Sequence, residues 1–353
     1  MEKRVMKIFS VILGGIMVLC AVLLVGIEDI HSKSEVLAKE MHDAKQYKET
    51  IANRMQDEIA NAEELKSFAD KGQIRIAIPS GVNTEKIQFN EDVMTRFYQI
   101  VIPNAGENYF DSNPIMGSVG NIDDFSAYTD DGAAFFEITL NGIYDTKTTV
   151  ENGFLYLDFR NPHDVYDSVI VIDAGHGGRD VGAVEGNVYE KNIDLDIVKQ
   201  LKAIIDADPS MKAYYTRLGD TNPSLEERVK LANDVNADVF LSVHNNSLSG
   251  FDARKTSGTQ VLYYANDATQ LSERFATICL DTLCAQLEST NRGLVNGNDI
   301  YIIHNSKSPV ALVEIGFLSN PDDLKKLQDS GYQRRCAQAL YDSVKEMINS
   351  FKE

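Results

Sequence analysis

The chain has 353 residues, which is enough for more than one domain. Its hydrophobic content of 43% and charged content of 25% are ordinary for a globular protein. The formal net charge of -19 argues against a nucleic-acid partner, which would favour a basic surface. Four cysteines without a Cys-x-x-Cys pair are too few for a disulfide scaffold, so any zinc ion would be bound by His and carboxylate groups.

An uncharged, mostly apolar run occupies residues 8–27. Its length suits a helix that crosses a bilayer. Lys3, Arg4 and Lys7 precede it and acidic residues follow, so the positive-inside rule predicts that residues 1–7 lie in the cytoplasm and the rest of the chain lies outside. A cleaved signal peptide is the alternative, but no small-x-small cleavage site precedes the end of this long run. We therefore expect an uncleaved, single-pass anchor in the cell membrane.

Residues 28–71 contain neither proline nor glycine, and apolar residues recur there at three- and four-residue steps. This spacing predicts a long amphipathic helix. Lys48 and Glu58 fall on the apolar stripe, which disfavours a strict coiled coil. A stalk that lifts the rest of the chain off the membrane is the simplest role. Self-association of the stalk, or its folding back on the catalytic crevice, stays open.

Between residues 73 and 164 the pattern changes to short alternating runs separated by turns rich in glycine and asparagine. Strands are expected at residues 73–78, 99–102, 133–140 and 154–159. This pattern predicts a small β-rich domain, such as a sandwich. It contains one histidine, His163, and no catalytic pattern. Its expected role is to bind a ligand or to act as a spacer between the neighbouring segments.

Strand and helix signals alternate over residues 167–353, which predicts an α/β domain with a mostly parallel sheet flanked by helices. Three buried strands are each followed by a polar residue: His176, His244 and Glu314. Ligands bind outside the carboxyl ends of such strands, so these side chains are expected to share one edge of the sheet. Glu190 opens a helix that is reached directly from the loop carrying His176.

The same region predicts the remaining elements in order. Further strands are expected at residues 211–216, 258–264 and 300–303. Helices are expected to begin at Glu190, at a capping box over residues 224–227, near residue 267, after Asn320-Pro321 and near residue 333. No internal repeat is evident.

Two imidazoles and a carboxylate at one sheet edge suit a metal ion. Catalytic zinc usually takes three protein ligands and leaves the fourth position to water, and His176, Glu190 and His244 make such a set. A glutamate at a helix N-terminus is also commonly just a complement to the helix dipole, so the residue types alone leave its role open. His304 could touch substrate or act as a third imidazole ligand, although a surface histidine is the simpler interpretation.

Five blocks of sequence resemble the zinc-dependent N-acetylmuramoyl-L-alanine amidases of the amidase-3 family. In chain order they are Asp173-Ala174-Gly175-His176-Gly177-Gly178, Glu190-Lys191-Asn192, Thr216-Arg217 with Asp220, Ser242-Val243-His244-Asn245-Asn246, and Val313-Glu314-Ile315-Gly316-Phe317-Leu318-Ser319-Asn320. The resemblance implies that His176, Glu190 and His244 bind one Zn²⁺. It implies that Glu314 is the catalytic carboxylate. It also implies the substrate, which is the amide joining the lactyl group of N-acetylmuramic acid to L-alanine in peptidoglycan.

The chemistry of these residue types agrees with that activity. Zinc polarises a carbonyl and lowers the pKa of bound water to around 7, and a nearby carboxylate can relay the water's proton. Glu314 ends an apolar strand, and such surroundings favour a raised carboxyl pKa. Arg217 is expected to pair with a carboxylate such as Asp220, and contact with a carboxylate of the peptide substrate is the alternative. Asp173 and Asn246 are expected to orient the zinc ligands.

The resulting hypothesis is a membrane-anchored peptidoglycan hydrolase with an extracytoplasmic catalytic domain. One alternative is a zinc peptidase acting within the stem peptide. Another is a non-catalytic wall-binding or activator protein, which the presence of the full ligand set disfavours. The β-rich domain is similar, by position and strand content, to the AMIN-type modules that accompany these amidases. No long insertion that could plug the site precedes Glu314, so an inhibitor or activator is expected to act through the stalk, the β-rich domain or another protein.

Overall fold

The computed structural model describes residues 72–117 and 120–352. The predicted anchor at residues 8–27 lies outside the described residues, and so does the predicted stalk up to residue 71. Among the described residues, no helix combines the length and the apolar character needed to cross a bilayer. By compactness the chain divides into residues 1–70 and 71–353, and all elements below belong to the second unit.

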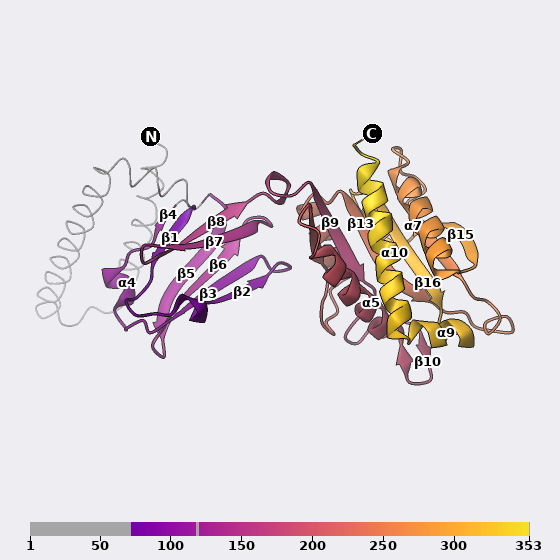
Figure 1. The fold of residues 1–353 in the computed structure, drawn as a ribbon, viewed down its shortest axis with the longest axis horizontal. Helices are drawn as coiled ribbons and strands as arrows, with labels where there is room; N and C mark the ends of the chain where they lie inside the picture. Colours follow the sequence, from indigo (N-terminus) through magenta and orange to yellow (C-terminus); the bar gives the residue numbers. More distant parts are fainter. Residues whose placement is uncertain (1–71, 118–119, 353) are drawn as a thin grey trace, which may run out of the picture. The chain divides into compact units, whose positions relative to one another are not determined.

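Eight strands between residues 74 and 160 form two four-stranded sheets of order β4-β1-β8-β7 and β2-β3-β6-β5 (Figure 1). The strands are β1 (Ile74–Ala77), β2 (Gln88–Asp92), β3 (Phe97–Pro103), β4 (Met116–Gly117), β5 (Ile122–Asp130), β6 (Ala133–Leu140), β7 (Asp145–Glu151) and β8 (Phe154–Arg160). A helix, α4 (Tyr109–Ser112), lies among them. Ile74 and Leu157 from one sheet share a core with Ile100 and Phe136 from the other, so the predicted sandwich is confirmed.

The four predicted strands of this sandwich are present, and four others were missed. Three of the missed strands, β2, β5 and β7, lie at the edges of their sheets. Their residues are mostly exposed and polar, as in the fully exposed Gln88–Asp92, so no apolar alternation marks them in the sequence. The fourth, β4, has two residues and is too short to carry a pattern.

A six-stranded sheet of order β12-β9-β13-β16-β14-β15 forms the centre of residues 168–349. Its strands are β9 (Ser168–Ala174), β12 (Met211–Tyr215), β13 (Val239–Asn246), β14 (Thr259–Tyr263), β15 (Asn291–Asn296) and β16 (Val310–Phe317). The four strands β12, β9, β13 and β16 are parallel, as predicted. β14 runs antiparallel to β16 and β15 is parallel to β14, so the sheet as a whole is mixed.

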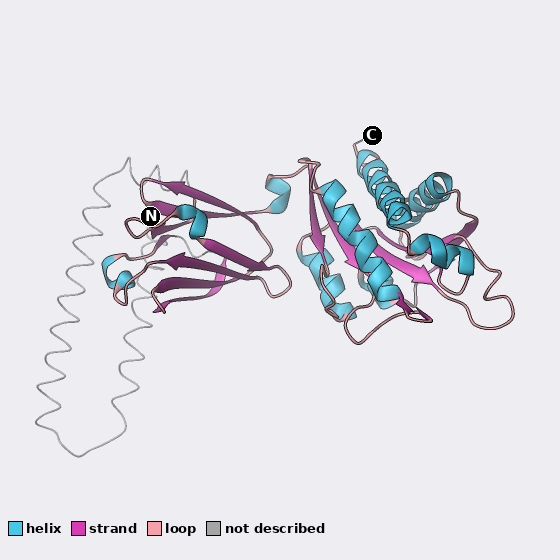
Figure 2. Cartoon of the chain, turned by 60° about the horizontal axis from the view of Figure 1, so that its bottom comes forward, coloured by secondary structure: helices cyan, strands magenta, loops and turns pink. Residues whose placement is uncertain are grey.

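Helices cover both faces of this sheet (Figures 1 and 2). One face packs against α5 (Glu190–Ile205), α7 (Leu271–Leu287) and α10 (Ser330–Asn349), and the other against α6 (Leu225–Asp234) and α8 (Tyr301–Asn305). The central strands are therefore buried on both sides, and every residue of β9 is buried. This double burial explains the apolar run at residues 169–172 within β9.

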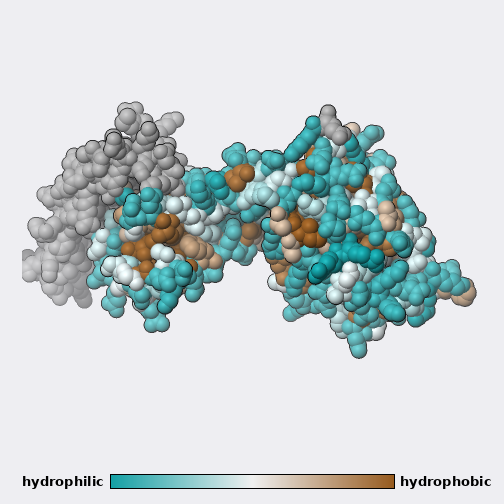
Figure 3. Space-filling model, viewed as in Figure 1, coloured by the Kyte–Doolittle hydropathy of each residue, from teal (hydrophilic) through white to brown (hydrophobic). Residues whose placement is uncertain are grey.

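The outer helices are amphipathic. In α10 the apolar residues Leu340, Val344 and Met347 face the core, while the surface over α5 and α10 is mostly hydrophilic (Figure 3). The predicted capping box is confirmed, because Ser224 and Glu227 exchange hydrogen bonds at the start of α6. Asn320 likewise caps α9 (Pro321–Leu327).

The prediction of a strand at residues 300–303 is wrong. These residues enter α8, where Ile302 and Ile303 are buried against the sheet and His304 is exposed. A five-residue helix is too short to show a helical period, so two adjacent isoleucines suggested a strand. The true edge strand there is β15, whose residues are exposed or half-buried and lack an apolar run.

Candidate metal centre

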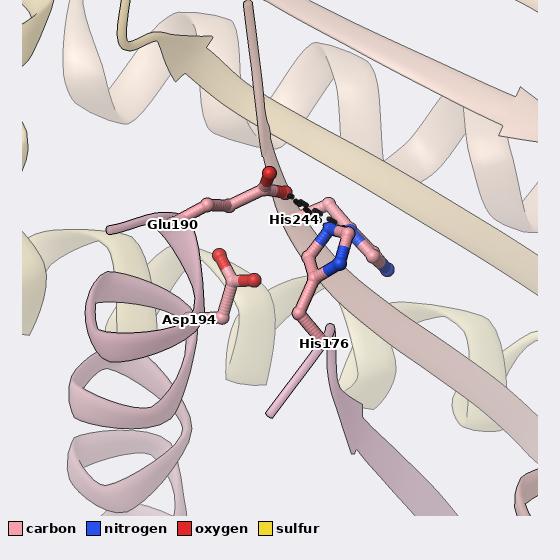
Figure 4. Close-up of side chains that lie close together, drawn as sticks. All are labelled: His176, Glu190, Asp194 and His244. Atoms are coloured by element: carbon pink, nitrogen blue, oxygen red, sulfur yellow. Dashed lines mark hydrogen bonds and ion pairs between the residues drawn. The ribbon is translucent and has the colours of Figure 1, made fainter. Parts of the chain in front are cut away.

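The candidate site lies where β9 and β13 end and α5 begins (Figure 4). His176 follows β9 by two residues, and Glu190 is the first residue of α5. His244 lies in β13, two residues before the end of that strand. The structure brings these three side chains together, and their potential ligand atoms lie within 4.8 Å of one another and of Asp194. Glu314 is paired with His244 across the parallel strands β16 and β13.

Glu190 lies at the centre of the group. Its Oε1 is 3.1 Å from Nε2 of His176 and 3.1 Å from Nδ1 of His244. The backbone N–H of Ala183 donates to Oε2 and that of Asn245 donates to Oε1. Burial alone would raise the pKa of Glu190, but the two imidazoles hold it well below its usual range. Glu190 is therefore an anion aimed at two ring nitrogens.

His176 is held in a left-handed backbone conformation with φ of 58°. The buried Arg228 donates to the carbonyl of His176, and the buried Arg217 donates to the carbonyl of Gly175. Nδ1 of His176 lies 2.9 Å from Asp180, which directs Nε2 toward Glu190. These contacts fix both the main chain and the ring of His176.

Arg217 does not form the predicted pair with Asp220. Its guanidinium donates to backbone carbonyls around the His176 loop, including Ala174 and Lys191. The Lys191 ammonium takes the Asp220 carboxylate instead, at 2.8 Å. The reason is geometric: Arg217 is buried, and its guanidinium donates to the backbone carbonyls of Ala174, Gly175, Lys191 and Gly219.

Asp173 orients the site only indirectly. Its carboxylate accepts hydrogen bonds from Thr216, Ser242 and Arg228, and Arg228 in turn holds the His176 carbonyl. Burial would raise the pKa of Asp173, but Arg228 lowers it overall, so a buried ion pair lies beneath the loop. The side chain of Asn246 donates to Gln260 and not to a candidate ligand, so the prediction for Asn246 is wrong.

Two glycines leave room for the candidate ligands. A Cβ on Gly175 would lie 2.3 Å from the His244 ring. A Cβ on Gly182 would lie 2.6 Å from Oε2 of Glu190, and φ of Gly182 is 66°. Any larger residue at either position would therefore displace a ring or a carboxylate from the group.

Asp194 is a member of the group that the sequence analysis missed. It lies one turn beyond Glu190 on α5 and is completely buried (Figure 4). Its Oδ1 accepts a hydrogen bond of 2.8 Å from the side chain of Asn245, which follows His244. Burial and the charge of Glu190 raise the pKa of Asp194 well above its usual value. The hydrogen bond between Asp194 and Asn245 therefore joins α5 to the end of β13. The i, i+4 spacing from Glu190 was the one sequence signal for Asp194.

We expect Asp194→Ala to lower the free energy of unfolding by about 2 kcal/mol, because it leaves the buried amide of Asn245 without its acceptor. Asp194→Asn keeps a carbonyl acceptor and adds no charge, so its cost is expected to stay below about 1 kcal/mol. Urea unfolding of both variants measures the difference. Equal losses in the two variants would contradict a hydrogen-bonded role for Asp194.

Glu314 lies next to His244 with one carboxylate oxygen unpaired. Its Oε2 is buried and has no hydrogen-bond partner among the described residues. Burial raises the pKa of Glu314 to about 7, with a further contribution from Glu190 and opposition from His244. A carboxyl group with such a pKa can both accept and donate a proton near neutral pH.

His304 lies apart from this group. Its exposed ring packs edge-on against Tyr264, with ring centroids 5.7 Å apart. The group of potential ligands among the described residues does not include it. The interpretation of His304 as a surface histidine agrees with this position.

Without a bound metal, the stability of this site is expected to depend on pH. Glu190 and Asp180, against the effect of burial, raise the pKa of His176 from 6.5 to about 9. The stabilisation from protonated His176 is therefore full below 6.5 and is lost as pH rises through about 9. We expect the difference in unfolding free energy between wild type and His176→Ala, without metal, to shrink by about 2 kcal/mol across this window. Urea unfolding on both sides of it is the measurement, His304→Ala is the control, and a constant difference would contradict the prediction.

The fold and the site together define an α/β protein with a His–Glu–His set and an adjacent buried carboxylate at one sheet edge. Residues 170–346 match the protein family described as N-acetylmuramoyl-L-alanine amidase, and the chain belongs to this family. The family resemblance seen in the five sequence blocks is thereby confirmed.

Relatives of known name agree with this membership. The chain is 36% identical over 185 residues to N-acetylmuramoyl-L-alanine amidase LytC of Bacillus subtilis, a match that covers 52% of this chain and 36% of LytC. It is 32% identical over 190 residues to the germination-specific N-acetylmuramoyl-L-alanine amidase of Bacillus subtilis, covering 50% of this chain and 78% of that protein. The chain thus spans about a third of the length of LytC and most of the second relative.

Solved structures of similar proteins cover a similar share of the chain. The catalytic domain of CwlV from Bacillus (Paenibacillus) polymyxa is 35% identical, with a TM-score of 0.48, over 52% of this chain and 98% of that one. An N-acetylmuramoyl-L-alanine amidase from Clostridium difficile 630 is 31% identical, with a TM-score of 0.49, over 52% of this chain and 97% of that one.

Proposed function

We propose that this protein is a zinc-dependent N-acetylmuramoyl-L-alanine amidase that hydrolyses the amide between the lactyl group of N-acetylmuramic acid and L-alanine in peptidoglycan. The observation that carries the proposal is the convergence of His176, Glu190 and His244 beside the unpaired carboxylate of Glu314. Family membership supplies the reaction class.

The donor set fits zinc. Two imidazole nitrogens and one carboxylate oxygen already face one another, which is the ligand number and type of a catalytic zinc site with an open position. When bound, zinc supplies Lewis-acid polarisation of the amide carbonyl and a lowered pKa of water. Asp180, which orients His176, and the N–H groups of Ala183 and Asn245, which hold Glu190, would keep the ligands in place.

Glu314 performs the proton transfers in this proposal. It accepts a proton from the attacking water as the carbon–oxygen bond forms. It then delivers that proton to the amine as the carbon–nitrogen bond breaks, which leaves a lactyl carboxylate and a peptide with a free L-alanine amine. The raised pKa of Glu314, about 7 in the metal-free protein, is suited to both directions of transfer.

Product analysis tests the reaction. Purified protein is incubated with peptidoglycan, and released fragments are identified by mass spectrometry with and without a chelator. The proposal requires glycan that carries free muramic acid and intact peptides that begin with L-alanine. Fragments cut within the stem peptide would favour a zinc peptidase, and no release at any zinc concentration would favour a wall-binding protein.

We also propose that residues 8–27 anchor the protein in the cell membrane with the amidase domain outside. The uncharged run and the basic residues before it support this orientation, and peptidoglycan lies on that side. The test is protease treatment of intact spheroplasts that carry a C-terminal tag. Recovery of the tagged domain in the soluble external fraction, or protection of the tag from protease, would overturn the proposal.

A further inference from the structure

A pocket of about 130 Å³ lies at the carboxyl end of β16, the strand that carries Glu314. Three segments line it: the hairpin of β10 (Val184–Glu185) and β11 (Val188–Tyr189), the loop of residues 247–258 after β13, and the segment from the end of β16 into α9. The lining side chains that matter here are Glu185, Arg254, Leu318, Ser319, Leu324 and Lys325.

Two hydrogen bonds connect the segments that line this pocket to the segments that carry the candidate ligands. The N–H of Leu318 donates to the carbonyl of Asn246, two residues beyond His244, at 2.7 Å. On the opposite wall, Ala183 donates to Glu190 and lies two residues before Glu185. One wall of the pocket is therefore bonded to β13, the strand that carries His244. The other wall follows, two residues later in the chain, the residue that is bonded to Glu190.

The loop that carries Arg254 is fixed to the pocket at three points. The N–H of Leu248 donates to the hydroxyl of Ser319, at 3.1 Å. The buried Asn320 donates from its side chain to the carbonyl of Arg254, also at 3.1 Å. The N–H of Gly258 donates to the buried carboxylate of Asp323 at 3.0 Å. These bonds hold the backbone of Arg254 at the pocket rim. The Arg254 side chain is therefore attached to a fixed point of the backbone, which limits where its guanidinium can reach.

The charges of the lining favour an anionic ligand. Arg254 and Lys325 contribute two positive charges and Glu185 contributes one negative charge, in a chain whose net charge is -19. Arg254 and Glu185 are 3.5 Å apart, but their side chains are 69% and 39% exposed. Exposed ion pairs of this kind contribute little free energy, so the guanidinium can exchange Glu185 for a ligand carboxylate.

We propose that this pocket is the subsite for the peptide arm of the substrate, in which Arg254 and Lys325 bind a side-chain or main-chain carboxylate of an acidic stem peptide. The inference rests on the proposed amidase function. Of the two arms that leave the scissile amide, the glycan arm is made of uncharged sugars and gains nothing from two cations. A peptide carboxylate gains charge-assisted hydrogen bonds, bidentate ones from the planar guanidinium. The half-buried, apolar side chain of Leu324 suits the aliphatic part of such a peptide.

The test compares two muramyl peptides that differ only in one acidic residue, which bears a free carboxylate in one and a carboxamide in the other. The full chain is used, and KM is measured for each substrate. We expect Arg254→Gln to raise KM for the carboxylate substrate by about tenfold, which corresponds to about 1.4 kcal/mol, and to leave KM for the carboxamide substrate unchanged. Lys325→Gln is expected to act in the same direction with a smaller effect.

Matched controls are available one residue away. Lys255→Gln changes the next cation of the same loop and Lys326→Gln the next cation of α9, and neither side chain lines the pocket. If Arg254→Gln and Lys255→Gln give the same ratio of KM values for the two substrates, the subsite is refuted while the amidase function stands.

A binding measurement separates the subsite from the reaction. Fluorescence anisotropy of the labelled acidic peptide and of its carboxamide is measured with Glu314→Gln protein, in which no hydrolysis is expected. Tighter binding of the carboxylate form that is lost in the Arg254→Gln, Glu314→Gln double variant supports the subsite even if neither muramyl peptide is cleaved, an outcome that would refute the proposed function alone. Equal binding of the two peptides refutes the subsite.

Discussion

Glu314→Gln is expected to lower kcat by about 10²–10⁴-fold, the usual contribution of a general acid–base group. Glutamine has nearly the same shape but cannot take a proton from water at neutral pH. Because Oε2 of Glu314 has no partner among the described residues, the substitution breaks no hydrogen bond there. Zinc content and fold are therefore expected to be unchanged, which makes the loss of kcat attributable to proton transfer.

An exposed glutamate serves as the control for the buried Glu314. Glu346→Gln, on the exposed side of α10, is expected to keep full activity.

In metal-free protein, burial raises the pKa of Glu314 from 4.5 to about 7, so the folded state is destabilised as pH rises from 4.5 to 7. Glu314→Gln should therefore be more stable than wild type above pH 7 and equal to it near pH 4. A kcat within fivefold of wild type would contradict the catalytic role.

Glu190→Gln is expected to weaken zinc binding by more than about 100-fold, since losing a direct ligand should exceed the 10–100-fold effect of losing a supporting residue. Two imidazoles would remain, and the carboxamide is a poorer donor than the anion that now faces both rings. Activity should fall in proportion to the zinc lost at limiting metal. Competition with a chromophoric chelator measures the dissociation constant.

Removal of the metal from wild type is the companion experiment. A chelator is expected to abolish amide hydrolysis, and added Zn²⁺ to restore it, with the secondary structure unchanged in circular dichroism. Glu185→Gln, in the hairpin that precedes α5, is the matched control for zinc affinity. Stoichiometric zinc in Glu190→Gln protein at wild-type affinity would exclude Glu190 as a ligand.

The sequence predicted the meeting of His176, His244 and Glu314 because all three follow or end parallel strands of one sheet. The chain direction of such strands places their carboxyl ends at one edge, and this rule needs no knowledge of side-chain contacts. Glu190 was predicted with less support from residue type alone, since a glutamate at a helix start has a common structural role. The family resemblance decided in its favour.

The supporting contacts could not be predicted in the same way. Asp194 lies on α5 among apolar positions, and its partner Asn245 is 51 residues away on β13. Nothing in the local sequence distinguishes a buried aspartate from a solvated one. Arg228 likewise carries the signature of an exposed helix residue, yet it is buried and joins Asp173 to the His176 loop.

The direction of β14 could not be predicted from the sequence either. Its composition predicted a strand at residues 258–264, but antiparallel and parallel strands have the same alternation. The direction follows from the path of residues 247–258, which are tied to the segment after β16 and return the chain along that strand. Contacts between residues so far apart in the chain are visible only in the folded structure, so the sequence alone does not reveal them.

Arg217 and Arg228 hold the His176 turn through hydrogen bonds that require no ion. The turn is therefore shaped by the polypeptide's own groups, and Asp173 balances the buried positive charge of Arg228 beneath it. Substitution of either arginine is expected to shift the His176 ring, although neither guanidinium is bonded to that ring.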